Sequence, residues 1–343
     1  MAEDKFLEEV LKTFGEHTII SESSEIIPIS TGSISLDASI GIGGIPRGRI
    51  TEIFGSEGTG KTTIALCLAR SALEAGEKVL YIDAENMLDY SLVEAIIGDA
   101  LDKSRLAILN PETGEDAFRM VEMGVNSGTF SLVILDSIGA LAPKKEKEDD
   151  LEDHNVALIA RLVTKVLRRI SFQVKATNTA LVLLNQVRDK VGSFMGGFET
   201  PGGHALKHFS ALRIALTKGA QISTGTAKAG TKEVYGVDVN FVIRKNKLAA
   251  PFRGFHLPII FGKGIDSAMD SLEFCTMLGI LKKSGAFYKL DGEVLGQGKL
   301  AAAEALRGNK LALDKMREKV YNILNINNTV VEHTAVIVEE EKE

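Results

Sequence analysis

Apolar positions form short runs that alternate with helical patterns from Ile50 onward. Strands are predicted where β-branched and other apolar residues run together and end at a polar residue. These runs are RITEIFG (49–55), KVLYIDA (78–84), RLAILN (105–110), SLVILD (131–136) and ALVLLNQ (180–186). Helical spacing lies between them, over Thr62–Ala75, Leu88–Gly98, Gly114–Ser127 and Val156–Ser171. This alternation predicts an α/β fold with a central, mostly parallel sheet.

The two ends of the chain have other patterns. Residues 1–17 predict an amphipathic helix whose apolar stripe, Phe6 to Phe14, must pack on the chain's own body or on a neighbouring chain. Further strands are predicted at 211–216, 239–248 and 255–264 without helices between them. From about residue 265 a small α+β module with a hairpin at Ala286–Val294 is expected. We therefore expect an N-terminal segment (1–26) that packs on the body or on a neighbouring chain, an α/β core (27–262), a C-terminal domain (263–326) and a mobile acidic tail (327–343).

Composition narrows the class of protein. The 343 residues are 45% hydrophobic and carry a formal net charge of −6. No apolar run reaches the roughly 18–20 residues of a membrane span, and the N-terminus lacks the apolar core of a signal peptide, so a cytoplasmic location is expected. Cys67 and Cys275 are expected to be buried free thiols. Because the overall charge is acidic, any surface that binds nucleic acid must be built from local basic clusters.

GSEGTGKTT, residues 55–63, matches the pattern G-x-x-x-x-G-K-[ST] between a predicted strand and a predicted helix. Glycines allow the tight turn that points backbone N–H groups at phosphate oxygens, and the following helix adds its dipole. The residues expected to hold ATP are Gly55, Ser56, Glu57, Gly58, Thr59, Gly60, Lys61, Thr62 and Thr63. Lys61 supplies a cation for the β- and γ-phosphates, and the Thr62 hydroxyl can ligate Mg²⁺.

The ends of three other predicted strands carry polar groups at the same sheet edge. Asp136 suits the magnesium role of phosphate-loop enzymes, although a strand-terminal Asp is more often a simple helix cap. Glu85 could deprotonate an attacking water, or it could be an ordinary surface residue. Asp83 is expected to cap the turn that follows it. Gln186 is placed to sense the γ-phosphate and to pass its state to the segment that follows, Val187–Phe209.

Several motifs together resemble the bacterial RecA recombinases, over about residues 5–326. The matching segments are Ile29–Thr63, Tyr81–Asp89, Val133–Lys144, Asn185–Gly192, Gly202–Phe209, Arg244–Phe252 and Ser284–Lys299. The resemblance implies a DNA-dependent ATPase that forms helical filaments on single-stranded DNA. It further implies homologous pairing and strand exchange with double-stranded DNA in recombinational repair and the SOS response to DNA damage. Repressor and mediator proteins are further partners that it suggests.

The resemblance also implies roles for single residues of the nucleotide site. Lys61, Thr62, Asp136, Glu85 and Gln186 correspond to the phosphate lysine, the magnesium ligands, the residue that activates water and the residue that couples ATP to DNA. Other matching positions are Asp89 and Phe261 in the adenine pocket, and Lys245 and Lys247, which would reach a neighbouring subunit's ATP. Leu92 stands where a stacking Tyr is expected, which leaves nucleotide selectivity open. Without the resemblance, RKNK (244–247) would be interpreted as a solvated basic turn.

The segment Val187–Phe209 corresponds to the family's second DNA loop. Cations would hold the DNA backbone, apolar side chains would contact bases and glycines would keep the loop adaptable. The expected DNA contacts are Arg161, Arg168, Arg188, Lys190, Gly192, Phe194, Met195, Phe198, Gly202, Gly203, Lys207 and Arg213. Lys165 and Arg169 lie on the same predicted helix. The first DNA loop, Lys145–Ala157, is acidic here, with Val156 and Ala157 where a Gly and an inserting Met would be expected. Lys282, Lys283 and Lys299 are candidate contacts to duplex DNA in the C-terminal module.

Two other functions fit part of this pattern. A ring-shaped helicase would share the ATPase core, and a RecA-like regulator would bind ATP and DNA but hydrolyse poorly. The intact set of Lys61, Glu85, Asp136 and Gln186 favours a working ATPase. A bacterial or a viral source and co-protease activity are left open by the sequence.

Overall fold

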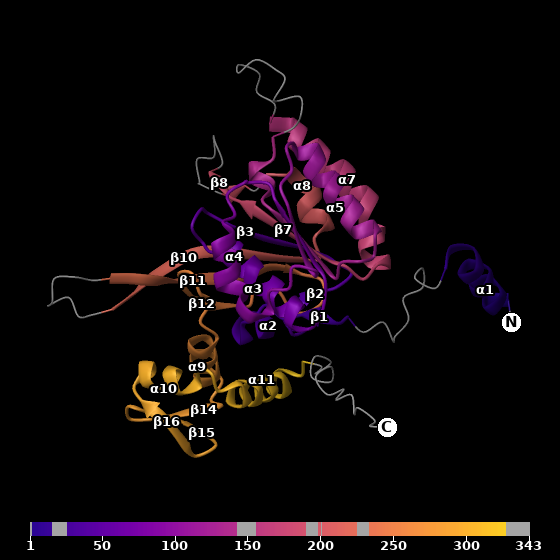
Figure 1. Cartoon of the computed structure of the whole chain (residues 1–343). Coiled ribbons are helices and arrows are strands. Elements are labelled where there is room, and N and C mark those ends of the chain that lie inside the picture. Colours follow the sequence, from indigo (N-terminus) through magenta and orange to yellow (C-terminus); the bar gives the residue numbers. More distant parts are fainter. Residues whose placement is uncertain are drawn as a thin grey trace, which may run out of the picture.

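The computed structural model describes residues 2–15, 26–142, 156–189, 198–199, 201–224 and 233–326. A large sheet with helices on both faces forms the centre of the molecule, and a smaller module follows it (Figure 1). This is the α/β architecture predicted from the alternation of strands and helices. Residues 16–25, the segment 143–155, most of the second DNA loop and the tail 327–343 lie outside the described residues.

The described helices include α1 (Ala2–Phe14), α2 (Ile34–Ile40), α3 (Lys61–Glu74), α4 (Tyr90–Ile97), α5 (Gly114–Asn126), α7 (Val156–Ala176), α8 (Gly203–Phe209), α9 (Ser267–Met277), α10 (Lys299–Leu306) and α11 (Lys310–Leu324). The strands of the main sheet are β3 (Ile50–Gly55), β4 (Val79–Asp83), β5 (Leu106–Leu109), β6 (Leu132–Asp136), β7 (Ala180–Gln186), β10 (Leu212–Thr224), β11 (Glu233–Asn246), β12 (Gly254–Ile260) and β13 (Gly264–Ile265). Smaller pairs are formed by β1 (Pro28–Ile29) with β2 (Ile45–Pro46) and by β8 (Arg188–Asp189) with β9 (Phe198–Glu199).

The order of the nine-stranded sheet is β13-β12-β11-β10-β3-β7-β6-β4-β5. From β10 to β5 every neighbouring pair is parallel, whereas β10 to β13 run antiparallel. The register places Gly55 opposite Gln186 and Asp83 opposite Asp136. The carboxyl ends of β3, β7, β6 and β4 therefore meet at one edge, where open parallel sheets bind ligands.

Apolar side chains fill both faces of this sheet. One buried cluster joins α3 and α4 to the strands, with Leu66, Leu68 and Ile96 among its members. The other joins α5 and α7 to the opposite face, through residues such as Phe118 and Leu167. Figure 1 shows these two helical layers on either side of the strands. Burial on both faces explains why these strands are continuous apolar runs in the sequence.

Local signals set the boundaries of several helices. α4 begins at Tyr90 instead of the expected Leu88, because the Asp89 carboxylate accepts a hydrogen bond from the Ser91 N–H at 2.8 Å and so caps the helix. α7 continues to Ala176, past the predicted end at Ser171, because its buried face includes Val174.

The C-terminal module has its own core, which contains Leu272, Leu306 and Tyr321. The hairpin expected at Ala286–Val294 is formed by β15 (Phe287–Leu290) and β16 (Glu293–Gln297), and β14 (Leu281–Ser284) adds a third antiparallel strand. Lys299, expected to contact duplex DNA, forms an ion pair with Glu273 of α9. Cys67 and Cys275 are buried free thiols, as predicted.

The amphipathic helix predicted at the N-terminus is α1, and Figure 1 shows it apart from the other helices. Phe6 on this helix is 66% exposed, so its ring is not covered by the described residues of the same chain. Within the described ranges, no helix is both long and apolar enough to cross a membrane.

Candidate nucleotide and DNA site

The predicted phosphate loop lies between β3 and α3. Gly60 directly precedes α3 and has φ +72°, a conformation that side chains other than glycine rarely adopt. A Cβ on Gly60 would lie 2.5 Å from Ile259 Cδ1, and one on Gly55 would lie 2.6 Å from the Leu216 carbonyl oxygen. Both glycines are therefore required by conformation or space. The backbone of residues 55–60 forms the kind of cradle that phosphate groups need.

Lys61 lies folded over this loop. Its Nζ donates to the carbonyl oxygens of Gly55 at 3.1 Å and Ser56 at 2.9 Å. Burial lowers the pKa of the Lys61 ammonium, while the Asp136 and Glu85 carboxylates act in the opposite direction. A lysine held by two neutral carbonyls can turn to a phosphate without breaking an ion pair. The site thus fits a polyphosphate.

Asp136 lies beside the first turn of α3, at the end of β6. Its Oδ2 accepts a hydrogen bond from the Thr62 hydroxyl at 2.7 Å and another from the Tyr81 hydroxyl at 2.7 Å. Burial raises the pKa of Asp136, and these two hydrogen bonds act to lower it. A hydroxyl next to a carboxylate is a donor set of the kind that Mg²⁺ prefers in phosphate-loop enzymes. The structure thus places both predicted magnesium ligands together.

Glu85 and Gln186 meet across the same sheet edge, although they are far apart in the sequence. The Gln186 Nε2 donates to Glu85 Oε1 at 3.0 Å, and the Ser137 hydroxyl donates to the same oxygen at 2.6 Å. Asp83 caps the turn as predicted, since its carboxylate accepts from the Glu85 N–H at 3.1 Å and from the Leu88 N–H at 2.9 Å. The candidate base and the candidate phosphate sensor are therefore in direct contact.

The two residues predicted to contact adenine, Asp89 and Phe261, are both exposed. Asp89 caps α4, and the Phe261 ring is 57% exposed just after β12. Leu92 is partly buried against the core and so offers less open surface than an aromatic ring would.

A buried polar network links β3, β7 and β10. Glu52, in the middle of β3, is fully buried and forms an ion pair with Arg213 of β10. The Asn185 Nδ2 donates to Glu52 Oε1 at 3.0 Å and to the Pro201 carbonyl oxygen at 2.9 Å. A signal of this network is present in the sequence, since a Glu inside an apolar strand needs a buried partner.

Arg213 was predicted to contact DNA, and the structure gives it a different place. Its guanidinium is paired with Glu52 and lies over the Phe54 ring, 4.5 Å from the ring centroid. With its side chain only 13% exposed and paired with Glu52, Arg213 presents little free charge at the surface.

Lys245 and Lys247 lie at the end of β11. The Lys245 Nζ donates to the carbonyl oxygens of Lys207 at 2.7 Å and His208 at 3.0 Å, near the C-terminus of α8. Burial lowers the pKa of Lys245, and the nearby Lys247 lowers it further. Lys247 is exposed. Within one chain, Lys245 is thus bound to the helix that follows the second DNA loop.

The remaining predicted DNA residues fall into three groups, and the members of one, Gly202, Gly203 and Lys207, lie at the N-cap of α8 and within that helix. Arg161, Lys165 and Arg168 share one exposed face of α7 and line a shallow groove of about 670 Å³, with Arg169 at its end in an ion pair with Glu122. Lys190, Gly192, Phe194 and Met195 lie outside the described residues, as do the side chains of Arg188 and Phe198. The backbones of β8 and β9 pair, which brings the two ends of the second DNA loop together next to Gln186.

Comparison with known proteins agrees with this geometry. A family model described as the RecA N-terminal domain matches residues 2–266, and one described as the RecA C-terminal domain matches residues 270–325. Protein RecA of Thermus aquaticus is 40% identical over 325 residues, covering 92% of this chain and 93% of its own. Those of Aquifex aeolicus (38% over 333 residues, 96% and 94% covered) and Bacillus subtilis (36% over 346 residues, 99% and 97% covered) are similar throughout. The chain belongs to the RecA family.

Proposed function

We propose that this RecA-family recombinase, a protein of DNA recombination and repair, works as a DNA-stimulated ATPase that forms helical filaments on single-stranded DNA in the cytoplasm. One observation carries the proposal. Glu85 and Gln186 are in contact at the edge of the phosphate loop, and Gln186 leads within two residues into β8. The residue that contacts the proposed base therefore ends β7, and the segment that would bind DNA begins at β8, directly after it.

The phosphate loop holds the triphosphate through its backbone N–H groups, and Lys61 turns from the Gly55 and Ser56 carbonyls to the phosphates. Thr62 and Asp136 hold Mg²⁺, which neutralises charge on the phosphate oxygens when it is bound. Glu85 positions and deprotonates the attacking water. Asp89 and Phe261 border the base. Lys245 and Lys247 of a neighbouring subunit supply positive charge in trans, which makes efficient turnover depend on assembly.

Coupling to DNA runs through Gln186. Its amide donates to Glu85 and so occupies an oxygen of the proposed base. A γ-phosphate is a competing acceptor for the same Nε2 group. When Gln186 moves toward the γ-phosphate, it releases Glu85 and shifts the link between β7 and β8. The nucleotide state and the affinity for DNA therefore change together.

DNA binds along the face of α7 and the second DNA loop. Arg161, Lys165 and Arg168 point from one helical face and supply charge for the phosphate backbone. Arg188, Lys190, Gly192, Phe194, Met195 and Phe198 complete the surface, with Gly202 and Gly203 at the start of α8 and Lys207 in its last turn. Stacking of apolar side chains on bases gives binding that is tolerant of sequence.

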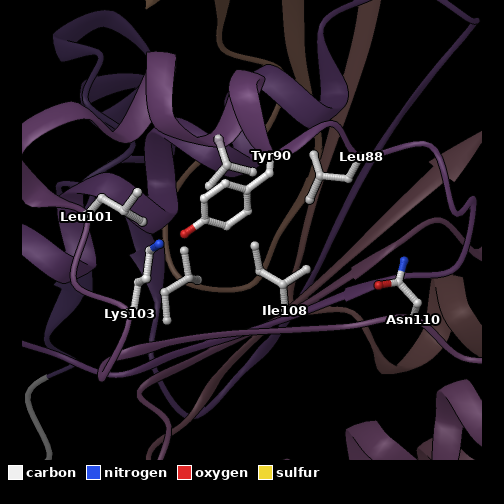
Figure 2. A pocket seen from close by; sticks show the side chains of 8 residues that line it. Leu88, Tyr90, Leu101, Lys103, Ile108 and Asn110 are labelled. Atoms are coloured by element: carbon white, nitrogen blue, oxygen red, sulfur yellow. The ribbon is translucent and has the colours of Figure 1, made fainter.

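Self-association uses the free edge of the sheet. Among the described strands, β5 pairs only with β4. A pocket of about 400 Å³ lies between β5 and α4, and Figure 2 shows Tyr90, Leu88 and Ile108 around it with Lys103 at its rim. We propose that α1 of a second copy docks here, because Phe6 is exposed on α1 and the neighbouring Glu8 and Glu9 complement Lys103.

The function is tested by measuring ATP turnover with and without single-stranded DNA, together with electron microscopy and a strand-exchange assay. DNA-stimulated turnover with helical filaments and exchange is the expected result. Unwinding by closed rings would favour a helicase, and DNA binding without turnover would favour a regulator.

The role of α7 in DNA binding predicts a change in salt dependence. Arg161→Ala combined with Arg168→Ala should reduce the slope of log K against log salt for single-stranded DNA by about 1.4, at ~0.7 for each lost phosphate contact. ATP binding should be unchanged. Lys78→Ala, which removes an exposed cation before the amino end of β4, is the control and should leave the slope unaltered. An unchanged slope in the double variant would show that Arg161 and Arg168 of α7 do not contact DNA phosphates.

The docking proposal predicts that Phe6→Glu prevents filament formation, since a carboxylate cannot enter an apolar pocket without losing its hydration. Light scattering and electron microscopy in the presence of ATP and DNA measure the result. Met123→Glu, at a side chain 65% exposed on α5, is the matched control and should still assemble. Normal filaments from Phe6→Glu would show that α1 does not dock through this ring.

A further inference from the structure

Tyr81 lies in the middle of β4 with its side chain fully buried against the α3 face of the sheet. In the sequence VLYID it occupies a position where any large apolar residue would satisfy the pattern of a buried strand. The hydroxyl adds a polar group to this core, and a buried hydroxyl is unfavourable unless it has a partner. Its partner is Asp136, whose Oδ2 accepts the hydrogen bond at 2.7 Å.

The same carboxylate oxygen accepts the hydroxyl of Thr62 at 2.7 Å. Tyr81 and Thr62 therefore approach Asp136 from two different elements, the strand β4 and the helix α3. Thr62 is at the mouth of the phosphate loop and interacts with the incoming ligand. Tyr81 is packed in the core and cannot follow the ligand, so its hydrogen bond fixes the carboxylate in the same orientation before and after binding.

We propose that Tyr81 is a positioning residue, which orients the Asp136 carboxylate for magnesium through the bond from its hydroxyl to Oδ2. This inference rests on the proposed nucleotide site and goes beyond it by naming a residue that touches neither nucleotide nor metal. Groups that orient metal ligands from behind typically change metal affinity or activity 10–100-fold when they are removed. Because the ring is held by the core, Tyr81 orients Asp136 at no further cost in conformational freedom at the moment of binding.

Tyr81→Phe removes only the hydroxyl oxygen and keeps the ring that fills the core. Binding of a fluorescent ADP analogue is measured over a range of Mg²⁺ concentrations, without turnover. We expect the Mg²⁺ concentration for half-maximal binding to rise about tenfold, with nucleotide affinity restored at saturating Mg²⁺. Replacing Tyr81 with 4-aminophenylalanine, whose amino group donates in place of the hydroxyl, should return the Mg²⁺ dependence toward that of the original chain.

The matched control is Tyr321→Phe. Tyr321 is also buried, and its hydroxyl donates to the Gly43 carbonyl oxygen at 3.4 Å, in the core of the C-terminal module. A role in packing or stability alone would affect both variants in thermal unfolding but neither in Mg²⁺ dependence. A Tyr81→Phe curve within twofold of the original overturns this inference and leaves the proposed nucleotide site intact. Nucleotide binding by the original chain that is independent of Mg²⁺ overturns both.

Discussion

Glu85→Gln is expected to lower kcat for ATP hydrolysis by about 10²–10⁴-fold, the usual contribution of a general base. The glutamine side chain retains an oxygen that can accept from Gln186 and from Ser137, so the contacts seen for Glu85 can persist. The carboxylate that would take a proton from water is lost. Because Glu85 lies beyond the phosphate loop, nucleotide binding and filament assembly should be retained.

The measurement is steady-state turnover at saturating DNA, with nucleotide affinity determined separately. Glu94→Gln, an exposed position on α4, is the control and should leave kcat unchanged. Loss of nucleotide binding together with turnover would mean that Glu85 supports the phosphate loop. A kcat within tenfold of the original would show that Glu85 is not the general base.

Glu52→Ala is expected to lower the free energy of unfolding by about 3–5 kcal/mol, because removal of one member of a buried ion pair leaves the other charge without compensation. The Glu52 side chain has no exposed surface, and that of Arg213 is 13% exposed. The substitution also removes the acceptor of the Asn185 amide. Denaturant unfolding measures the change.

A double-mutant cycle separates the interaction free energy of Glu52 with Arg213 from the effect of each substitution on its surroundings. Glu52→Leu with Arg213→Met should be closer in stability to the original chain than either single change, because no uncompensated charge remains. Glu74→Ala, which breaks an exposed pair with Arg70, is the control and should have a much smaller effect. Additive losses at Glu52 and Arg213 would show that the two side chains are not coupled.

Much of the ATPase core could be predicted because its signals are local. The phosphate loop is specified by consecutive residues, and the parallel strands β3, β4, β6 and β7 are largely apolar runs. Asp136 was predicted from its place after β6, and its contact with Thr62 follows once β6 lies near β3. The predicted α/β fold was confirmed. That prediction also rested on a local signal, the alternation of strands and helices along the sequence.

Contacts between distant residues could not be predicted in the same way. In the sequence Tyr81 is typical of a core aromatic residue, and its hydrogen bond to Asp136 depends on β4 and β6 lying side by side. Lys245 is typical of a solvated cation, and its bond to the Lys207 carbonyl depends on where α8 packs. The partner of Arg213 was missed because pairing with Glu52 depends on sheet order, which periodicity does not encode. The contacts of these residues follow only from the tertiary arrangement.

The position of β3 in the sheet has a consequence for synthesis of the chain. β3 carries the phosphate loop, yet its two neighbours, β7 and β10, come more than a hundred residues later, as the separations of 133 between Asn185 and Glu52 and 161 between Arg213 and Glu52 illustrate. Pairing across such separations is slow, because long loops must close before contacts reward them. The phosphate loop therefore reaches its final form only after β10 has left the ribosome. Until β7 emerges, nascent β3 has two unpaired edges, and one of them stays unpaired until β10 follows.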